Sequence, residues 1–212
     1  MKPCIILIGA QHVGKTTLGK ALAEKLGVPF IDTDQEVSRI CGIHITKFYF
    51  YGGQEGYNFA EAGVGRLLVE RFKNEKKLSA VISTGSGFSG NEDGYRVLSQ
   101  IGTFYWLDGD LEIGAKRIIE EATEGAKDES KKNPLLFSYG KFANLYDYAV
   151  NDKVETEEDL RKSYLKSELP TLKRYEKFAD VIVRPKDAPV SENLDLLYKS
   201  IIWDESKERK VV

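Results

Sequence analysis

The sequence predicts an α/β fold in which helices cover both faces of a parallel β-sheet. Short apolar, β-branched runs alternate along the chain with longer segments of helical character, a pattern typical of parallel sheets. With 212 residues, 42% of them hydrophobic, the chain is long enough to bury a real core. It contains no internal repeat and no linker-like composition. We therefore expect one domain spanning residues 1–212, with insertions between its elements.

The first half of the chain predicts three strands with helices between them. Residues 3–8 form a β-branched run that ends at Gly9, which is typical of a buried strand. The apolar side chains of 15–26 recur at helical spacing, and Gly27 is placed to end that helix. The elements expected next are a strand over 28–31, a segment of helical character over 35–40, a helix over 55–72 after the glycines 52–53, and a strand over 80–84.

The second half predicts two further strands, which makes five. The expected elements are a strand over 103–107, a helix over 111–121, a breaker-rich segment over 122–140, helical patterning over 141–178 interrupted near Asn151 and at Pro170, a strand over 181–183 and a helix over 190–203. Within the patterned segment, Phe142, Tyr146 and Ala149 would share one helical face. The charged tail from Asp204 is expected to fray.

Polar and glycine residues follow four of the expected strands. They are Gly9, Asp32 with Asp34, Gly85 and Asp108. The carboxyl ends of parallel strands meet at one edge of the sheet, and ligands bind in the crevice outside that edge. The binding site is therefore expected there.

Composition excludes several classes of partner. Lys and Arg number 31 against 33 Asp and Glu, so the net charge of −2 gives no general attraction to nucleic acid or to an anionic membrane. No apolar run approaches the about 20 residues of a membrane span. Cys4 and Cys41 are expected to be free thiols in a reducing cytosol, which predicts a cytoplasmic protein. His12 and His44 have no metal-ligand partners at useful spacing.

Residues 9–16, Gly-Ala-Gln-His-Val-Gly-Lys-Thr, match the phosphate-loop pattern G-x-x-x-x-G-K-[ST] at every position. Such a loop curls so that successive backbone N–H groups point at phosphate oxygens, and glycine tolerates the dihedral angles that this requires. Lys15 is expected to reach the β- and γ-phosphates and the Thr16 hydroxyl to bind Mg²⁺, while the next helix adds its dipole. The residues expected to bind the nucleotide are Gly9, Val13, Gly14, Lys15, Thr16 and Thr17.

With the stretch 31–34, Ile-Asp-Thr-Asp, the chain resembles the shikimate kinase family of small P-loop kinases. The likeness recurs at 81–87, 134–136 and 179–183. The resemblance implies a three-layer α/β/α P-loop kinase fold with a five-stranded parallel sheet, and an enzyme that transfers the γ-phosphate of ATP, with Mg²⁺, to a hydroxyl of a small molecule. It also implies a substrate-binding insertion at about 35–75 and a lid at about 122–140, to which this chain adds an aromatic-rich helical segment at about 141–168.

The resemblance also implies roles for single residues. Lys15 and Asp34 would be catalytic, with Asp34 contacting the substrate hydroxyl, and Asp32 would assist Mg²⁺ through water beside Thr16. Phosphoryl transfer needs charge neutralisation and a group that receives the hydroxyl proton, so the two carboxylates suit the reaction. The alternative for two Asp after a strand is a turn with a helix N-cap. Arg117 would lie near the nucleotide base, or else be a surface helix charge.

The substrate end departs from the family pattern. The family grips the carboxylate of shikimate with arginines, because a planar guanidinium matches a carboxylate in two hydrogen bonds. The pattern Gly-Glu-x-x-Phe-Arg-x-x-Glu falls on 53–61 and places Asn58 at the arginine. A second arginine falls on Glu168 or Thr171 and a third on Asn133; the cations that could compensate are Lys132, Lys166, Lys173 and Arg174. The residues still expected to bind substrate are Asp34, Asn58, Gly85, Ser86 and Gly87, of which the last three stand where the family has three glycines.

Three functions are compatible with the sequence. A kinase acting on shikimate or a related metabolite follows from the resemblance along the whole chain. A kinase with a different hydroxyl acceptor fits the missing arginines. An ATP-binding sensor or partner protein without catalysis is the third, although the intact Lys15, Asp32 and Asp34 argue against it. In each case the expected state is a monomer or a weak homodimer.

Overall fold

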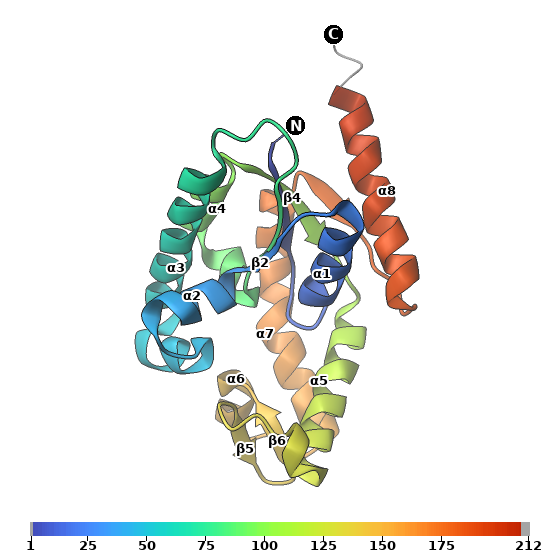
Figure 1. Ribbon diagram of the computed structural model, residues 1–212. Helices are drawn as coiled ribbons and strands as arrows, with labels where there is room; N and C mark the ends of the chain where they lie inside the picture. The colour runs from blue at the N-terminus through green and yellow to red at the C-terminus, as the bar shows by residue number, and fades with distance from the viewer. Residues whose placement is uncertain (1, 209–212) are drawn as a thin grey trace.

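A five-stranded parallel sheet forms the centre of the protein in the computed structural model, which describes residues 2–208 (Figure 1). Its order is β2-β3-β1-β4-β7, and every neighbouring pair is parallel. The strands are β1 (Cys4–Ile8), β2 (Phe30–Asp32), β3 (Ala80–Ser83), β4 (Gly102–Leu107) and β7 (Val181–Val183). The predicted α/β fold with five parallel strands is confirmed.

Helices cover both faces of this sheet. They are α1 (Lys15–Leu26), α2 (Thr33–Cys41), α3 (Ile45–Phe72), α4 (Glu92–Leu98), α5 (Leu111–Lys127), α6 (Asp147–Asn151), α7 (Glu157–Phe178) and α8 (Val190–Glu208), with short 3-10 turns η1 (Ser86–Gly90) and η2 (Glu129–Lys131). In Figure 1, α2, α3 and α4 lie on one side of the sheet and α1 and α8 on the other. None of the helices within residues 2–208 combines the length and apolar character that crossing a lipid bilayer requires.

Strand β1 shows why its sequence is apolar at every position. Ile5 and Leu7 belong to the hydrophobic cluster on the α1 side of the sheet, whereas Ile6 and Ile8 belong to the cluster on the α3 side. Successive side chains of a strand point to opposite faces, so a strand buried on both faces needs an unbroken apolar run. The two clusters together hold the sheet between its layers of helices.

The parallel sheet brings the predicted ligand-binding residues together. Leu7 of β1 and Asp32 of β2 both pair in register with Ser83 of β3. The segments that follow these strands therefore leave the sheet at the same edge. One is the phosphate loop, one is the first turn of α2 with Asp34, and one begins at Gly85.

The segment after α5 corrects one prediction. Residues 142–145, expected to be helical, form strand β6 (Phe142–Leu145), which pairs antiparallel with β5 (Phe137–Tyr139). Gly140, at φ 58, makes the tight turn between them. Phe142 and Leu145 are buried in the cluster that also contains α5, so Phe142 does not share a helical face with Tyr146. Tertiary packing has overridden the helical spacing.

Other boundaries also differ from expectation. Pro170 does not interrupt α7, which buries Tyr164 before the proline and Tyr175 after it. Helix α5 continues six residues beyond Glu121, into the breaker-rich segment, and α4 was not predicted. Helix α8 continues past Asp204, where fraying was expected, to Glu208; residues 209–212 of that tail lie outside the described residues. The break expected at the glycines before 55 is confirmed as a kink at Gly53, φ 59.

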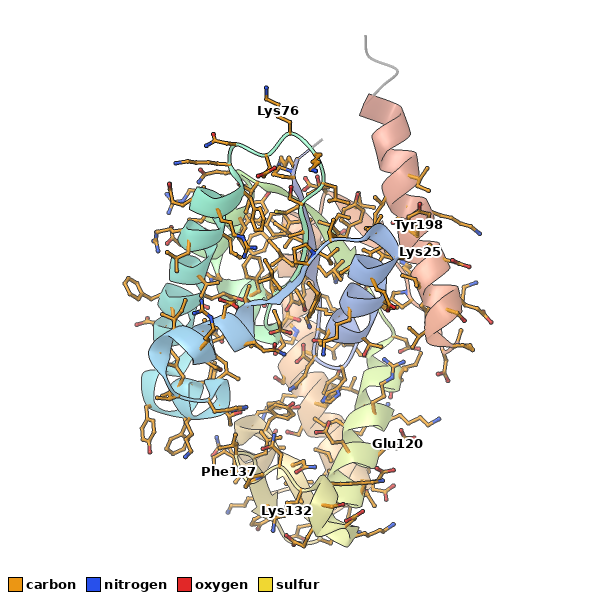
Figure 2. The ribbon with its side chains drawn as sticks, viewed as in Figure 1. Lys25, Lys76, Glu120, Lys132, Phe137 and Tyr198 are labelled. Atoms are coloured by element: carbon orange, nitrogen blue, oxygen red, sulfur yellow. The ribbon has the colours of Figure 1, made fainter. Side chains whose placement is uncertain are left out.

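The β5–β6 end lies at a distance from the α1–α8 end of the molecule. Figure 2 places Lys132 and Phe137 at the former and Lys25 and Tyr198 at the latter, where the Lys25 ammonium lies 4.6 Å from the centre of the Tyr198 ring. The Phe137 ring approaches that of Phe50 in α3, with centroids 5.9 Å apart. The predicted lid thus touches the predicted substrate-binding insertion.

Candidate active site

The phosphate loop wraps around the side chain of Lys15. This side chain is buried, and its Nζ donates hydrogen bonds to the carbonyls of Gly9, at 2.7 Å, and Ala10, at 2.8 Å. Gly14 caps α1 in the left-handed region, φ 100, and Gly9 has φ 147. A Cβ atom on Gly9 would lie 2.7 Å from the Leu107 carbonyl oxygen. Both glycines of the motif are therefore required by dihedral angle, and Gly9 is required by space as well.

Arg117 of α5 supports the loop from outside. Its Nη1 donates to the His12 carbonyl at 2.8 Å. Burial, together with the positive charges of Lys15 and Arg117, lowers the pKa of His12 to about 4. His12 is therefore neutral near pH 7, and the 3.7 Å approach of its Nε2 to Glu121 is not an ion pair. Its ring instead meets Tyr146 edge-on.

A cavity of about 650 Å³, here called the phosphate-loop cavity, opens above the loop. Its lining includes residues 11–18, Asp32, Asp34, Arg117 and Asn133. Five of the predicted nucleotide-binding residues of the motif therefore lie along it, and so does Arg117. Gly9 contributes differently, since its carbonyl accepts from Lys15 beneath the loop. The structure brings the predicted nucleotide residues together.

Thr16 and Asp32, the two predicted magnesium residues, are in direct contact. The Thr16 hydroxyl donates to Asp32 Oδ2 at 3.2 Å, while Asp32 Oδ1 accepts from the backbone N–H groups of Asp34 and Gln35 and caps α2. Within the described residues, no three His, Cys, Asp or Glu side chains gather to hold a metal ion. Nucleotide-bound Mg²⁺ usually takes one or two protein ligands besides phosphate and water, so this pair fits it.

Asp34 lies where two cavities meet. It lines the phosphate-loop cavity and also a second cavity of about 410 Å³ between α3 and α7, here called the α3–α7 cavity. Its Oδ1 accepts a hydrogen bond from the Tyr57 hydroxyl at 2.6 Å. Burial raises the pKa of Asp34, and the hydrogen bond from Tyr57 opposes that rise. A Cβ on Gly85 would lie 1.8 Å from the Tyr57 oxygen, so only glycine fits there.

A buried carboxylate that was not predicted holds this region together. Glu61 accepts from the hydroxyls of Thr33 at 2.7 Å and Tyr57 at 3.1 Å, from the Gly85 backbone N–H at 3.1 Å and from Asn91 Nδ2 at 3.0 Å. Burial raises its pKa to about 7. Glu61 ends the motif aligned on 53–61 and follows Tyr57 by one helical turn. That spacing was the available signal.

The α3–α7 cavity is lined by polar and aromatic side chains from distant segments. They include Gln11, Asp34, Tyr49, Gln54, Tyr57, Ser86, Gly87, Gly90, Phe137, Tyr146, Tyr148, Glu168, Thr171 and Arg174. Ser86 and Gly87 therefore lie where substrate was predicted. Asn58 is not part of this lining, because its amide donates to the Gly90 carbonyl at 3.1 Å and accepts from Gln54 at 2.7 Å.

Helix α7 closes the cavity on the side of the phosphate loop. Glu168, one of the two positions that the arginine pattern falls on, is 5% exposed. Burial raises its pKa, and the Lys15 charge and a hydrogen bond from the Gln11 backbone lower it. Tyr175 donates to the Ser86 carbonyl. The helix thus binds both the phosphate loop and η1.

The four cations considered as replacements for the missing arginines differ in position. Lys166 pairs with Asp152 at 2.6 Å, and Lys132 approaches Glu129 at 3.4 Å. Lys173 is exposed on α7. Arg174 alone among the four lines the α3–α7 cavity.

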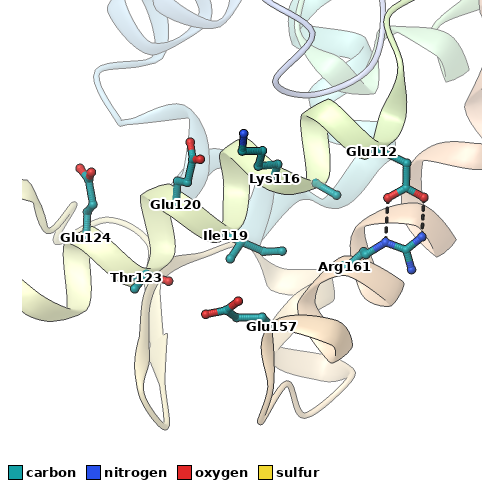
Figure 3. A pocket seen from close by; sticks show the side chains of 9 residues that line it. Glu112, Lys116, Ile119, Glu120, Thr123, Glu124, Glu157 and Arg161 are labelled. Atoms are coloured by element: carbon teal, nitrogen blue, oxygen red, sulfur yellow. Dashed lines mark hydrogen bonds and ion pairs between the residues drawn. The ribbon is translucent and has the colours of Figure 1, made fainter. Parts of the chain in front are cut away.

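A further cavity lies on the outer side of α5 and α7 and contains none of these residues. Glu112, Lys116, Glu120 and Arg161 are among its lining (Figure 3). Arg161 Nε donates to Glu112 at 2.7 Å, so its guanidinium is already paired. Its lining mixes charges of both signs that are solvent-exposed, and it has no glycine loop.

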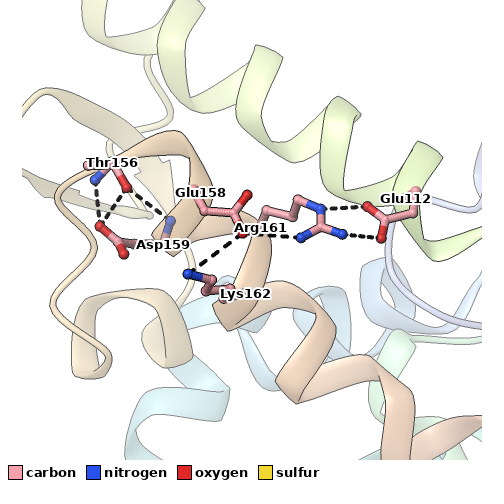
Figure 4. A network of polar contacts seen from close by, with 6 residues as sticks. All are labelled: Glu112, Thr156, Glu158, Asp159, Arg161 and Lys162. Carbon is pink, nitrogen blue, oxygen red and sulfur yellow. Dashed lines mark hydrogen bonds and ion pairs between the residues drawn. The ribbon is translucent and has the colours of Figure 1, made fainter.

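The ion pairs beside this outer cavity anchor the start of α7. Figure 4 shows Arg161 linking Glu112 of α5 with Glu158, which also approaches Lys162 at 3.7 Å. Thr156 and Asp159 cap the helix reciprocally, as a capping box does. These contacts fix α7 against α5, so that its other face can carry Glu168.

Comparison with known proteins identifies the family. The shikimate kinase family model matches residues 11–201. The shikimate kinase of Bartonella quintana (strain Toulouse) is 34% identical over 122 residues, 58% of this chain and 55% of that protein. The chain thus spans about half the length of that relative. The shikimate kinase of Histophilus somni (strain 2336) is 32% identical over 181 residues, 84% of this chain and 83% of that protein.

A solved structure agrees at the level of the fold. The shikimate kinase from Acinetobacter baumannii in complex with shikimate superposes with a TM-score of 0.65 at 24% identity, covering 96% of this chain and 95% of that one. Such identity supports the fold alone. Since the family model covers most of the chain, and the phosphate loop and the aspartates after β2 are in place, the protein belongs to the shikimate kinase family.

Proposed function

We propose that the protein is an ATP-dependent kinase that transfers the γ-phosphate to a hydroxyl of shikimate or a closely related metabolite. One observation carries the proposal. Asp34, a partly buried carboxylate, lines both cavities at the point where they meet, beside the phosphate loop. A group in that position can face a hydroxyl on one side and the terminal phosphate on the other.

The phosphate loop supplies the nucleotide side of the reaction. Its backbone N–H groups, the N-terminus of α1 and Lys15 provide positive charge where the phosphates would bind. Thr16 would hold Mg²⁺ directly and Asp32 through water, and the ion would neutralise phosphate charge. Arg117 would bind near the nucleotide base, from a position where it also supports the His12 carbonyl.

Asp34 supplies the acceptor side. As the acceptor oxygen bonds to the γ-phosphorus and the bond from that phosphorus to the bridging oxygen breaks, the hydroxyl proton passes to the Asp34 carboxylate. Burial raises the pKa of Asp34, which makes it a better proton acceptor than an exposed Asp. Tyr57 and Glu61 hold it in position, and Gly85 leaves room beside it.

Shikimate is the proposed acceptor because the relatives carry that name and one is bound to it. A different hydroxyl acceptor is favoured by one observation, the buried Glu168 at a position where an arginine was expected. A sensor without catalysis has no such support, since a pure nucleotide-binding protein does not need Asp34.

The test is ADP release by the purified protein with ATP, Mg²⁺ and millimolar shikimate, with mass spectrometry of the product. We expect ADP and phosphorylated shikimate in equal amounts, and little ADP without acceptor. ADP release with a neutral polyol but not with shikimate would show that the acceptor is a hydroxyl compound other than shikimate. ATP binding without turnover on any hydroxyl compound would favour the sensor.

The cytoplasmic location and the monomeric or weakly dimeric state stay predictions, the latter to be measured by light scattering.

A further inference from the structure

The charged residues of the α3–α7 cavity are arranged by sign. Asp34, Glu168 and Arg174 are the charged side chains in its lining, so Arg174 is the one cation there among the described residues. Glu168, Thr171 and Arg174 follow one another at intervals of three on α7 and share one face of that helix. One helix therefore presents a carboxyl group and a guanidinium cation to the same cavity.

The carboxyl group of Glu168 lies at the phosphate end of the cavity. Glu168 is 5% exposed, and its Oε2 has no hydrogen-bond partner. It lies near enough to Lys15 and to the Gln11 backbone for both to stabilise its charge. A carboxylate of an acceptor placed here would meet a like charge in a buried setting, which disfavours that orientation.

The guanidinium of Arg174 lies at the opposite end of the cavity. A Cβ on Gly90 would lie 3.7 Å from Arg174 Nη1, and the Gly90 carbonyl accepts from Asn58. The Asn58 side chain accepts from Gln54 and donates to the Gly90 carbonyl, and it does not line the cavity, so it does not take the place of a cation there. Arg174 is solvent-exposed and forms no ion pair within residues 2–208. Its guanidinium is available to a ligand.

We propose that Arg174 binds the carboxylate of the acceptor at the Gly90 end, while Glu168 keeps that carboxylate away from the phosphate end. The pair thereby orients the acceptor with its hydroxyl toward Asp34. This inference rests on the proposed function and assigns the residues that determine its specificity. Thr171, one of the two positions on which the arginine pattern falls, lies about one turn before Arg174, so Arg174 would supply the cation one turn further along α7.

The test measures shikimate binding and turnover separately. R174A should raise the Kd and the KM for shikimate by roughly 10- to 100-fold, the value of one or two charge-assisted hydrogen bonds. Its kcat and its KM for ATP should not change. R174K should lie between, because it keeps the charge but loses the bidentate geometry. K173A, at the exposed neighbouring position, is the matched control and should behave as wild type.

A carboxylate-free analogue, the methyl ester of shikimate, separates recognition from folding. R174A should bind this ester as wild type does. In the R174A background, E168Q should restore part of the lost affinity for shikimate, because it removes the opposing charge. A merely structural role for either residue would not produce that rescue.

The outcomes distinguish this inference from the proposed function. If wild type binds shikimate without releasing ADP, the proposed function fails while the Kd of R174A still decides the inference. An unchanged Kd in R174A, or failure of E168Q to restore affinity, overturns the inference even where turnover is normal. If wild type does not bind shikimate at all, both are wrong.

Discussion

The two ends of the candidate active site are built in different ways. At the phosphate end, consecutive residues of one loop wrap around a single buried ammonium group, which donates to two of their backbone carbonyls. At the acceptor end, side chains from α2, α3, η1 and α7 converge. A backbone-built site persists as long as its glycines and lysine remain. A side-chain-built site changes character with each substitution, and here Asn58, and either Glu168 or Thr171, stand where the family pattern predicts arginines.

The electrostatics of the two ends differ as well. Lys15 and Arg117 supply the positive charge at the phosphate end, where His12 stays neutral. Asp34, Glu61 and Glu168, by contrast, are carboxylates whose pKa values burial raises. The acceptor end is therefore acidic except at Arg174. The difference predicts that substitutions at the two ends will affect different kinetic constants.

The largest effect is expected for D34N. Asparagine keeps an oxygen that can accept from Tyr57 but cannot receive the hydroxyl proton, so kcat should fall by roughly 100- to 10,000-fold. The Kd for ATP should be unchanged, because the phosphate end is intact. Steady-state kinetics and calorimetric ATP titration measure the two quantities. D93N, on the exposed side of α4, is the control. Retained kcat in D34N would show that Asp34 is not the proton acceptor.

K15M tests the phosphate end in the same terms. Methionine fills the buried volume but removes the ammonium that neutralises the phosphates, so kcat should fall by roughly 100- to 1000-fold. Shikimate binding in the absence of nucleotide should be unaffected. K20A, an exposed position on the same helix, should have normal kinetics. Equal losses of ATP and shikimate affinity in K15M would mean that the two ends are not separable.

The pH dependence of stability reports on Glu61. Its pKa is about 7 in the folded protein against 4.5 ordinarily, so its stabilising contribution is full below pH 4.5 and is lost as pH rises toward 7. The slope is at most about 1.4 kcal/mol per pH unit. Urea unfolding of wild type should therefore show falling stability between pH 5 and 7, and E61Q should show a flatter profile.

The control for that experiment is E112Q. Glu112 is exposed, and its hydrogen bond with Arg161 lowers its pKa, so it does not titrate between pH 5 and 7. E112Q should keep the wild-type slope. A slope in E61Q as steep as that of wild type would assign the pH dependence to Asp34 and Glu168 instead.

Much of the phosphate end could be predicted from the sequence because its chemistry lies in consecutive residues. The spacing of the glycines, Lys15 and Thr16 specifies how the backbone of the loop curves, and the curved backbone itself forms the phosphate-binding site. The aspartates after β2 were predicted for a related reason, since strand ends of a parallel sheet meet. Asp32 is also the N-cap of α2, so the structural interpretation as a helix cap is correct and is compatible with the predicted role beside Mg²⁺.

The acceptor end could be predicted only in outline. The bonds from Thr33, Gly85 and Asn91 to Glu61 span between 24 and 30 positions of the sequence, and no local spacing encodes such a convergence. Strand β6 could not be predicted for a similar reason, because its conformation depends on contacts with other segments. Asn144 adopts φ 56 there, because its side chain bonds the Asn133 N–H and the Lys131 carbonyl. Both features depend on packing between segments.

The smallest effect is expected for R117A, which tests how far the phosphate end extends beyond its loop. The variant loses the hydrogen bond to the His12 carbonyl and a cation from the nucleotide cavity, so the KM for ATP should rise by roughly 2- to 12-fold. The kcat and the KM for shikimate should not change. K116A, one position earlier and exposed, is the matched control. If R117A and K116A have the same KM for ATP, Arg117 is a surface helix charge, and the phosphate end is confined to the loop itself. If only R117A weakens ATP binding, a side chain 105 positions away in sequence belongs to that end, and the contrast between a backbone-built and a side-chain-built site is one of degree.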